Sequence, residues 1–235
     1  NLKTLFYALI IALIIRSLFI QPFYIPSSSM EPTLLIGDRI FVKKYAYGFS
    51  KHSFPFSPPV ISGRIFNKTP KYGDLIVFKT PADNRTDYIK RLIGLPGDTV
   101  QFKNGKLILN KKEILRKKVS NTYKIRCGVG STQYNSFEET LPNGKNYVAV
   151  YNKLGTMQNT DEYKVPEGHF FLLGDNRDCS KDSRYLSSVG YVSYENLVGQ
   201  ASLIFFSNDT ISGSVLKFWN WNKSVRIERF FKILK

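Results

Sequence analysis

The chain has 235 residues, of which 43% are hydrophobic and 22% charged, a composition typical of a globular protein. Lys and Arg outnumber Asp and Glu by 34 to 18, a net charge of +16, which indicates a polyanionic neighbour, either nucleic acid or an anionic lipid surface. The two cysteines, Cys127 and Cys179, lie outside any C-x-x-C pattern, which excludes a disulfide framework and a zinc ribbon but leaves open one bridge or two free thiols. With only two histidines, His52 and His169, a metal site built on histidine is not expected. We also expect no cofactor.

The first 21 residues are predicted to form a transmembrane anchor. Residues 5–15 are apolar throughout, and an apolar stretch continues beyond Arg16 at 18–25. Sixteen helical residues would span roughly 24 Å of a hydrocarbon core about 30 Å thick, and a terminal arginine can reach the headgroups. A buried core helix and a cleaved secretory signal, for which 27–29 supplies small residues, are alternatives. The length of the apolar region favours a retained anchor.

Beyond this segment the patterns indicate a mostly β fold. Short β-branched or aromatic runs bounded by Gly, Pro or Lys predict strands at 39–42, 74–78 and 99–102. Asn104-Gly105 predicts a hairpin, because this pair tolerates positive φ at both turn positions, and Asn143-Gly144 is a weaker signal of the same kind. The proline-rich stretch 49–71 is expected to be a surface loop.

The C-terminal tail, 221–235, is predicted to form a short cationic amphipathic helix. Apolar residues at 227, 230, 231 and 234 follow the i, i+3, i+4, i+7 spacing, with Lys and Arg between them and two tryptophans just upstream. Such a helix suits a membrane interface, although packing on its own domain explains the pattern equally well. Together with the anchor, the tail favours lipid over nucleic acid as the anionic neighbour.

Three segments carry candidate chemistry: 27–34, 88–98 and 174–184. Each has a purely structural alternative. Ser28 and Glu31 have the spacing of a helix capping box, Lys90 could be a solvated lysine, and 174–184 could be a turn-rich loop held by Asp–Arg pairs. Because all three segments occur together after an apolar segment, we favour a functional role for them over the structural alternatives.

The three segments resemble the signatures of bacterial type I signal (leader) peptidases. Residues 22–38 (PFYIPSSSMEPTLLIGD) are similar to the nucleophile box, 88–98 (YIKRLIGLPGD) to the lysine box, and 174–184 (GDNRDCSKDSR) to the last signature. The motifs occur in the family's order and extend from residue 22 to about 200. The chain departs from the family at Cys179, where Asn is usual, and at Ser28, where Gly is common.

The resemblance implies a role for each matched residue and a serine endopeptidase that uses a Ser/Lys dyad. The implied roles are nucleophile for Ser29, general base for Lys90, oxyanion hole for Ser27 and the Ser29 N–H, orientation of the lysine for Ser180, and a supporting ion pair for Asp182 and Arg184.

A lysine base is chemically consistent with this chain. A serine hydroxyl needs an adjacent base, and Ser/Lys pairs are an established variant of the catalytic triad. A lysine with an ordinary pKa of about 10.4 is neutral in only about 0.04% of molecules at pH 7. Its pKa must therefore fall by about two units through burial, at a cost of about 3 kcal/mol. The apolar neighbours of Lys90 favour that shift. His169, the rival base, is interpreted as structural because its flanks resemble a turn entering a buried strand.

The resemblance further implies a mostly antiparallel β catalytic domain at 22–98 and 166–220, interrupted by a smaller β insertion at 99–165. It implies preprotein substrates cut after an A-x-A-like stretch, and a single-pass protein of the bacterial inner membrane with its catalytic domain on the outer face. Charge alone does not orient the anchor. The alternatives are a self-cleaving Ser/Lys repressor of the SOS type and a non-enzymatic, membrane-tethered cationic β-domain. We expect no nucleic-acid partner.

Overall fold

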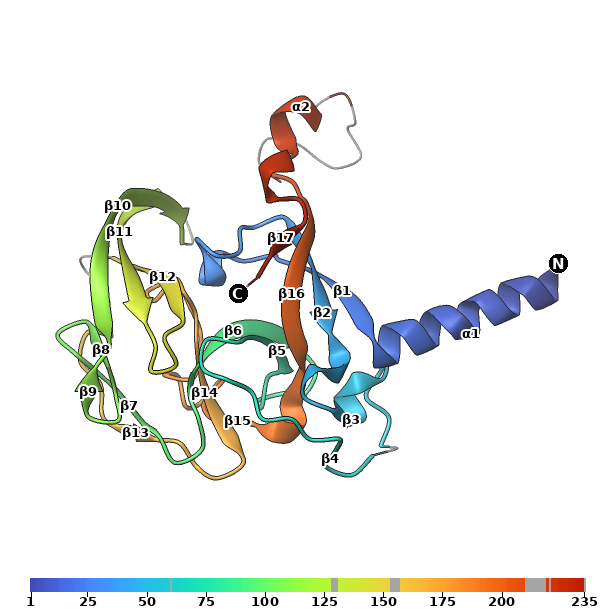
Figure 1. The fold of residues 1–235 in the computed structure, drawn as a ribbon, viewed down its shortest axis with the longest axis horizontal. Helices are drawn as coiled ribbons and strands as arrows, with labels where there is room; N and C mark the ends of the chain where they lie inside the picture. Colours follow the sequence, from blue (N-terminus) through green and yellow to red (C-terminus); the bar gives the residue numbers. More distant parts are fainter. Residues whose placement is uncertain (60, 128–130, 153–156, 210–218, 220, 235) are drawn as a thin grey trace.

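The computed structural model describes the chain except residues 60, 128–130, 153–156, 210–218, 220 and 235 (Figure 1). Its helices and strands are α1 (Leu2–Leu18), β1 (Ile20–Tyr24), β2 (Asp38–Lys43), β3 (Phe49–Ser50), β4 (Arg64–Ile65), β5 (Leu75–Lys79), β6 (Asp87–Gly94), β7 (Thr99–Lys103), β8 (Lys106–Leu109), β9 (Lys112–Glu113), β10 (Leu115–Arg126), β11 (Ser131–Thr140), β12 (Asn146–Tyr151), β13 (Tyr163–Lys164), β14 (His169–Leu173), β15 (Val192–Ser193), β16 (Leu197–Ser207), α2 (Trp221–Ser224) and β17 (Lys232–Ile233). The mostly β class is confirmed.

An antiparallel sheet in the order β1-β2-β16-β5-β6-β14-β15, with β17 added to β16, forms the centre of the molecule (Figure 1). The strands β5 and β14 are mostly apolar (LIVFK and HFFLL) and almost entirely buried, and the second half of β6, from Lys90 to Gly94, is buried as well. Consecutive buried residues in a strand mean that both faces of the sheet are covered there. The three strands therefore provide a rigid platform for side chains in the middle of the sheet.

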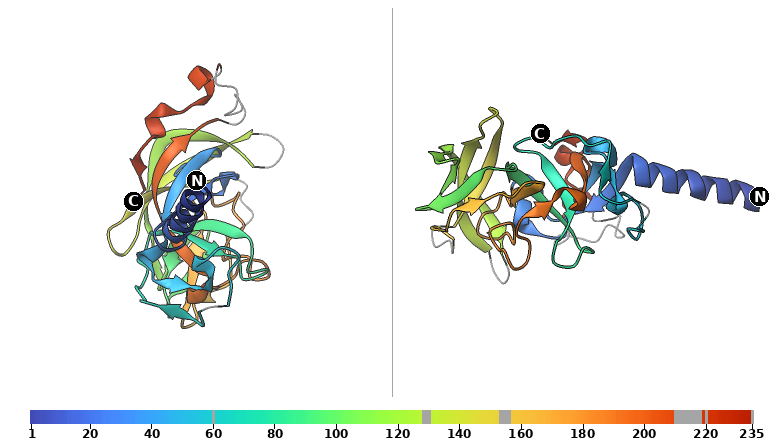
Figure 2. Two further views of the ribbon diagram at one scale, coloured as in Figure 1. Left: turned by 90° about the vertical axis from the view of Figure 1, so that its right-hand side faces the viewer. Right: turned by 90° about the horizontal axis from the view of Figure 1, so that it is seen from below.

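A second β region, between β6 and β14 in the chain, lies to one side of the central sheet (Figures 1 and 2). It contains a sheet in the order β13-β7-β8-β9 and another in the order β10-β11-β12. The hairpin at Asn104-Gly105 is confirmed, with φ of 49° and 69° at the two turn residues, as is the one joining β11 to β12. The boundaries 22–98, 99–165 and 166–220 stay predictions.

The N-terminal helix α1 extends away from the β-sheets (Figure 2). It has 17 residues, and its large apolar side chains are exposed along its length. Within the described residues, no helix combines the length and the apolar character that a membrane span requires.

The predicted amphipathic C-terminal helix is wrong. In its place α2 has only four residues, a 3-10 turn follows at Ile227–Arg229, and β17 pairs with β16. Two features explain the difference. The φ of Phe231 is 56°, which a right-handed helix does not accommodate. Arg229 turns inward to a buried ion pair with Asp38 at 2.6 Å, so the basic residues do not form one solvent face.

Candidate active site

Ser29 lies in a single 3-10 turn, Ser28–Met30, a few residues after β1. Three apolar side chains close to it in sequence, Ile25, Met30 and Leu34, are buried in the core between β2, β5 and β16. They fix the turn on both sides, while the short serine side chains remain at the edge of the sheet. The backbone around Ser29 is thereby held in place by hydrophobic packing.

Lys90 lies in β6, opposite Ile76 of β5, and is only 3% exposed. Its Nζ is 2.8 Å from Ser29 Oγ and donates to the carbonyl of Ile89 at 2.9 Å. This contact joins two residues 61 positions apart in the chain. The alternative of a solvated lysine is therefore wrong.

Burial lowers the pKa of Lys90 to about 8, and the nearby carboxylates of Asp182 and Asp175 partly oppose this shift. With that pKa, about one molecule in ten carries a neutral amine at pH 7. A neutral amine has a lone pair that can accept the hydroxyl proton of Ser29. The contact thus has the distance and the protonation that a Ser/Lys base requires.

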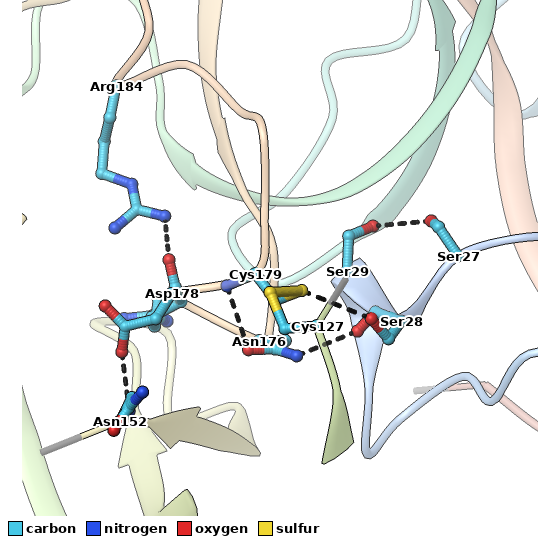
Figure 3. Close-up of a disulfide and its surroundings, with 10 residues drawn as sticks. Ser27, Ser28, Ser29, Cys127, Asn152, Asn176, Asp178, Cys179 and Arg184 are labelled. Carbon is cyan, nitrogen blue, oxygen red and sulfur yellow. Dashed lines mark hydrogen bonds between the residues drawn. A yellow bond between two sulfur atoms is a disulfide. The ribbon is translucent and has the colours of Figure 1, made fainter. Parts of the chain in front are cut away.

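The hydroxyl of Ser27 lies 3.3 Å from that of Ser29, and the two side chains point toward each other (Figure 3). Ser27 is exposed, whereas Ser29 is 8% exposed. A hydroxyl at this position is close enough to reach an oxygen that develops next to Ser29. Its role in an oxyanion hole stays a prediction.

Asn176 holds the nucleophile turn, a function that sequence reasoning missed. Its backbone N–H donates to the carbonyl of Ser29 at 3.1 Å, and its side-chain amide donates to the carbonyl of Ser28 at 3.2 Å. The oxygen of the same side-chain amide, Oδ1, accepts from the backbone N–H of Cys179 at 3.2 Å (Figure 3). The only indication of this role in the sequence is the position of Asn176 within the GDNRD segment.

Asp175 ties the lysine strand to the same loop. It accepts two hydrogen bonds, each of 2.7 Å, from the guanidinium of Arg91 and a third from Thr33 at 2.5 Å. Both charged partners are almost completely buried. Removing one of them would leave an unpaired buried charge, so this pair links the segments of the nucleophile, the base and the loop into one unit.

Asp182 and Arg184, the predicted supporting pair, form a bidentate contact of 2.8 and 2.9 Å. Asp182 also accepts from the backbone N–H of Gly174 at 3.0 Å, which closes the loop onto β14. Ser180 is buried, and its hydroxyl lies beside the carboxylate of Asp182. Burial raises the pKa of that carboxylate, but the Arg184 guanidinium and, to a smaller extent, the Ser180 hydroxyl contribute to lowering it overall. The predicted role of Ser180 in orienting Lys90 stays a prediction.

Gly174 is a second position that sequence reasoning did not single out. A Cβ there would overlap the side chain of Ser180 and the carbonyl oxygen of Ser29. The absence of a side chain therefore permits the close approach of the loop to the nucleophile turn.

Cys127 and Cys179 form a disulfide (Figure 3), which answers the question that the sequence left open. The bridge joins the end of β10, in the second β region, to the loop after β14. A buried ion pair of 2.8 Å between Arg177 and Glu139 of β11 connects the same two parts. Two independent links thus fix the loop against the second β region.

A cavity of about 400 Å³ opens beside Ser29 and Lys90. Its wall is mostly apolar and comes from β1, β2, β5, β6, the segment between β1 and β2, and the loop after β14; it includes Phe23, Ile25, Val77, Ile89 and Cys179. A cavity of this size and character suits small apolar side chains next to a scissile bond. His169, by contrast, lies at the start of β14, where its Nδ1 contacts the carbonyl of Glu167 at 2.9 Å.

A family model described as "Signal peptidase, peptidase S26" matches residues 1–206. The chain therefore belongs to the S26 family of signal peptidases. The signal peptidase I of Rickettsia typhi is 42% identical over 247 residues, covering 97% of this chain and 90% of the relative. That of Rickettsia bellii is 41% identical over 249 residues, covering 99% and 84%.

A solved structure of a signal peptidase I from Enterococcus faecalis is also similar, with 29% sequence identity. It covers 57% of this chain and 97% of the solved chain, with a TM-score of 0.33.

Proposed function

We propose that Ser29 is the nucleophile and Lys90 the general base of a signal peptidase. The chain, as a member of the S26 family, is a serine endopeptidase that removes signal peptides. The observation that carries the assignment is the 2.8 Å contact between Lys90 Nζ and Ser29 Oγ, made by an amine that is 3% exposed.

In the reaction, the neutral amine of Lys90 takes the hydroxyl proton as Ser29 Oγ attacks the scissile carbonyl carbon. The oxyanion accepts hydrogen bonds from the Ser29 N–H and the Ser27 hydroxyl. Collapse of this intermediate expels the amine of the mature protein, which takes the proton from Lys90, and leaves the signal peptide as an ester on Ser29. Water, deprotonated by Lys90, then hydrolyses the ester.

The substrates are preproteins whose small residues before the cleavage point enter the apolar cavity beside Ser29. We further propose that α1 anchors the enzyme in the bacterial inner membrane with the catalytic domain on the outer face. Two observations support this placement. The exposed side chains of α1 are apolar, and the disulfide between Cys127 and Cys179 is typical of an oxidising compartment.

Cleavage of a test preprotein by the purified full chain in detergent tests the assignment. We expect Ser29→Ala and Lys90→Met each to lower kcat/KM by about a thousandfold or more, because either loss removes the nucleophile–base unit. Lys103→Met, which removes an exposed lysine of β7, is the matched control and should stay within about twofold of wild type. Cleavage by Lys90→Met at a rate close to that of wild type would show that the base is wrongly assigned.

A further inference from the structure

A second cavity, of about 670 Å³, lies where α1 joins the β-sheets. It is lined by residues of the end of α1, β1, the loop that follows β3, and the loop between β5 and β6, together with Lys79 at the end of β5, Asp87 at the start of β6 and Val198 of β16. We call it the basal cavity. It adjoins the active-site cavity, with which it shares Phe23 and Asp87, but it contains none of the residues assigned to catalysis.

Positive charge dominates the basal cavity. Four of its lining residues are Lys or Arg and two are Asp. Lys79 is paired with Asp87 at 2.9 Å, and Lys51 with Glu195 at 3.0 Å. Arg16 and Arg85 form no ion pair with any described residue. Two guanidinium groups are therefore available to an anion, and guanidinium groups suit phosphate oxygens because they donate in pairs.

A buried cation lies behind the wall of the basal cavity. Lys44 is 2% exposed, and its ammonium donates to Gln21 Oε1 at 3.0 Å and to the carbonyl of His52 at 3.3 Å. Both acceptors belong to residues that line the cavity, and within the described chain Lys44 has no carboxylate partner in an ion pair. An anion in the cavity would be stabilised by this charge.

One side of the basal cavity is apolar. Phe54, Pro55 and Phe56 line it, and Phe56 is fully exposed. The base of α1 lies against β1 and the 3-10 turn Lys44–Ala46 (Figure 1), and the apolar side chains of the helix are exposed. The cavity thus presents guanidinium groups beside aromatic side chains at the end of an apolar helix.

We propose that the basal cavity binds the headgroup of an anionic glycerophospholipid, with Arg16 and Arg85 contacting the phosphate oxygens. Phe54 and Phe56 pack against the glycerol and the first methylene groups of the lipid. This inference rests on the proposed anchoring of α1 in a membrane. A lipid bound in the basal cavity would position the catalytic domain against the bilayer surface, next to the cavity that contains the nucleophile.

Native mass spectrometry of the full chain, released from mixed micelles with equal phosphatidylglycerol and phosphatidylcholine, tests the proposal. We expect wild type to retain phosphatidylglycerol and Arg16→Gln/Arg85→Gln to bind it about thirtyfold more weakly, since each basic residue contributes to anionic-lipid binding. The control Lys103→Gln/Lys112→Gln removes the same charge from exposed positions of β7 and β9 and should stay within about twofold of wild type.

Equal retention by wild type and Arg16→Gln/Arg85→Gln overturns the lipid site. So does stabilisation of wild type by inorganic phosphate with no lipid retained. A raised KM for preprotein in that variant with unchanged lipid retention would assign the basal cavity to the substrate instead. Ser29→Ala separates this proposal from the proposed function: it should lose cleavage and keep phosphatidylglycerol. Cleavage by Ser29→Ala would show that the proposed function has failed, whereas absence of phosphatidylglycerol from wild type, with cleavage still lost in Ser29→Ala, would show that only the lipid site has failed.

Discussion

Lys90 and Lys44 are buried to almost the same extent, beside two different cavities. They are 3% and 2% exposed, and burial lowers the pKa of each to about 8. Their partners differ. Lys90 contacts a hydroxyl, which can give up a proton, whereas Lys44 contacts an amide oxygen and a carbonyl oxygen, which can only accept.

The comparison shows that burial alone does not make a lysine a base. A lowered pKa makes the neutral amine accessible, but a proton must lie within reach for the amine to act on it. Lys44 has no such proton donor among its hydrogen-bond partners, and we interpret it as a fixed positive charge. Lys90 has one, and we interpret it as the base.

The largest expected effect comes from keeping the charge of Lys90 while removing its ability to be neutral. Lys90→Arg should lower kcat/KM by about a thousandfold or more, as Lys90→Met does, because a guanidinium is not deprotonated in proteins. Single-turnover cleavage of a preprotein measures the effect, with Lys103→Arg as the control. An active Lys90→Arg enzyme would mean that a positive charge at this position, and not a base, is what the reaction needs.

Removal of the disulfide should affect the two cavities differently, because Cys179 lines the active-site cavity but not the basal cavity. It closes a loop of 52 residues, so Cys127→Ser/Cys179→Ser should lower the free energy of unfolding by about 3 to 4 kcal/mol. Urea unfolding followed by tryptophan fluorescence measures this change. Phosphatidylglycerol retention should not change; an unchanged unfolding free energy would contradict the expectation.

The two lysines should respond to substitution with stability changes of different size. The pKa of Lys90 is lower in the folded than in the unfolded chain. The unfolded chain therefore binds more protons between about pH 8 and 10.5, and the cost of burying the amine is fully present below about pH 8. Lys90→Met should thus raise the free energy of unfolding at pH 7 by about 3 kcal/mol, and the gain should vanish near pH 10.5.

Lys44→Met should raise the free energy of unfolding at pH 7 by less than Lys90→Met does. It removes the same cost of burying an amine, since the pKa of Lys44 is also lowered to about 8, but it leaves the carbonyl oxygen of His52 and the half-buried amide oxygen of Gln21 without their donor, a loss of about 1 to 3 kcal/mol for a buried acceptor. Urea titrations at several pH values measure both variants. An equal gain in Lys90→Met and Lys44→Met would refute the distinction drawn between their partners.

The smallest expected effect is the pH dependence of wild type. With a pKa of about 8, the neutral fraction of Lys90 rises about tenfold between pH 7 and pH 9, and kcat/KM should rise with it. Initial rates on one preprotein across this range give the profile. Lys44 titrates over the same range, so the profile should be repeated with Lys44→Met, in which the rise must persist.

Two strands of the central sheet, β2 and β5, and the β7–β8 hairpin of the second β region could be predicted from local patterns. The strands at 39–42, 74–78 and 99–102 have compositions that fit a buried sheet, and Asn104-Gly105 has the φ values that its hairpin needs. Ser29 and Lys90 were brought together by resemblance, since no local pattern relates residues 61 positions apart.

What could not be predicted depends on contacts distant in the chain. The spacing of apolar residues in the tail predicted a helix. The prediction failed because this spacing contains no information about the ion pair between Arg229 and Asp38. The pairing of Cys127 with Cys179 and the hold of Asn176 on the nucleophile turn likewise exist only once the second β region and the loop after β14 are folded together.

Gly174 has a consequence for how this enzyme tolerates mutation. Position 174 contributes no functional group, yet any side chain there would push Ser180 and the Ser29 carbonyl apart. In a saturation library selected for cleavage, this position should be as intolerant as the nucleophile itself, and a methyl group would inactivate the enzyme without touching the hydroxyl or the amine. A single substitution at position 174 therefore cannot produce an enzyme that is both resistant to an inhibitor and active.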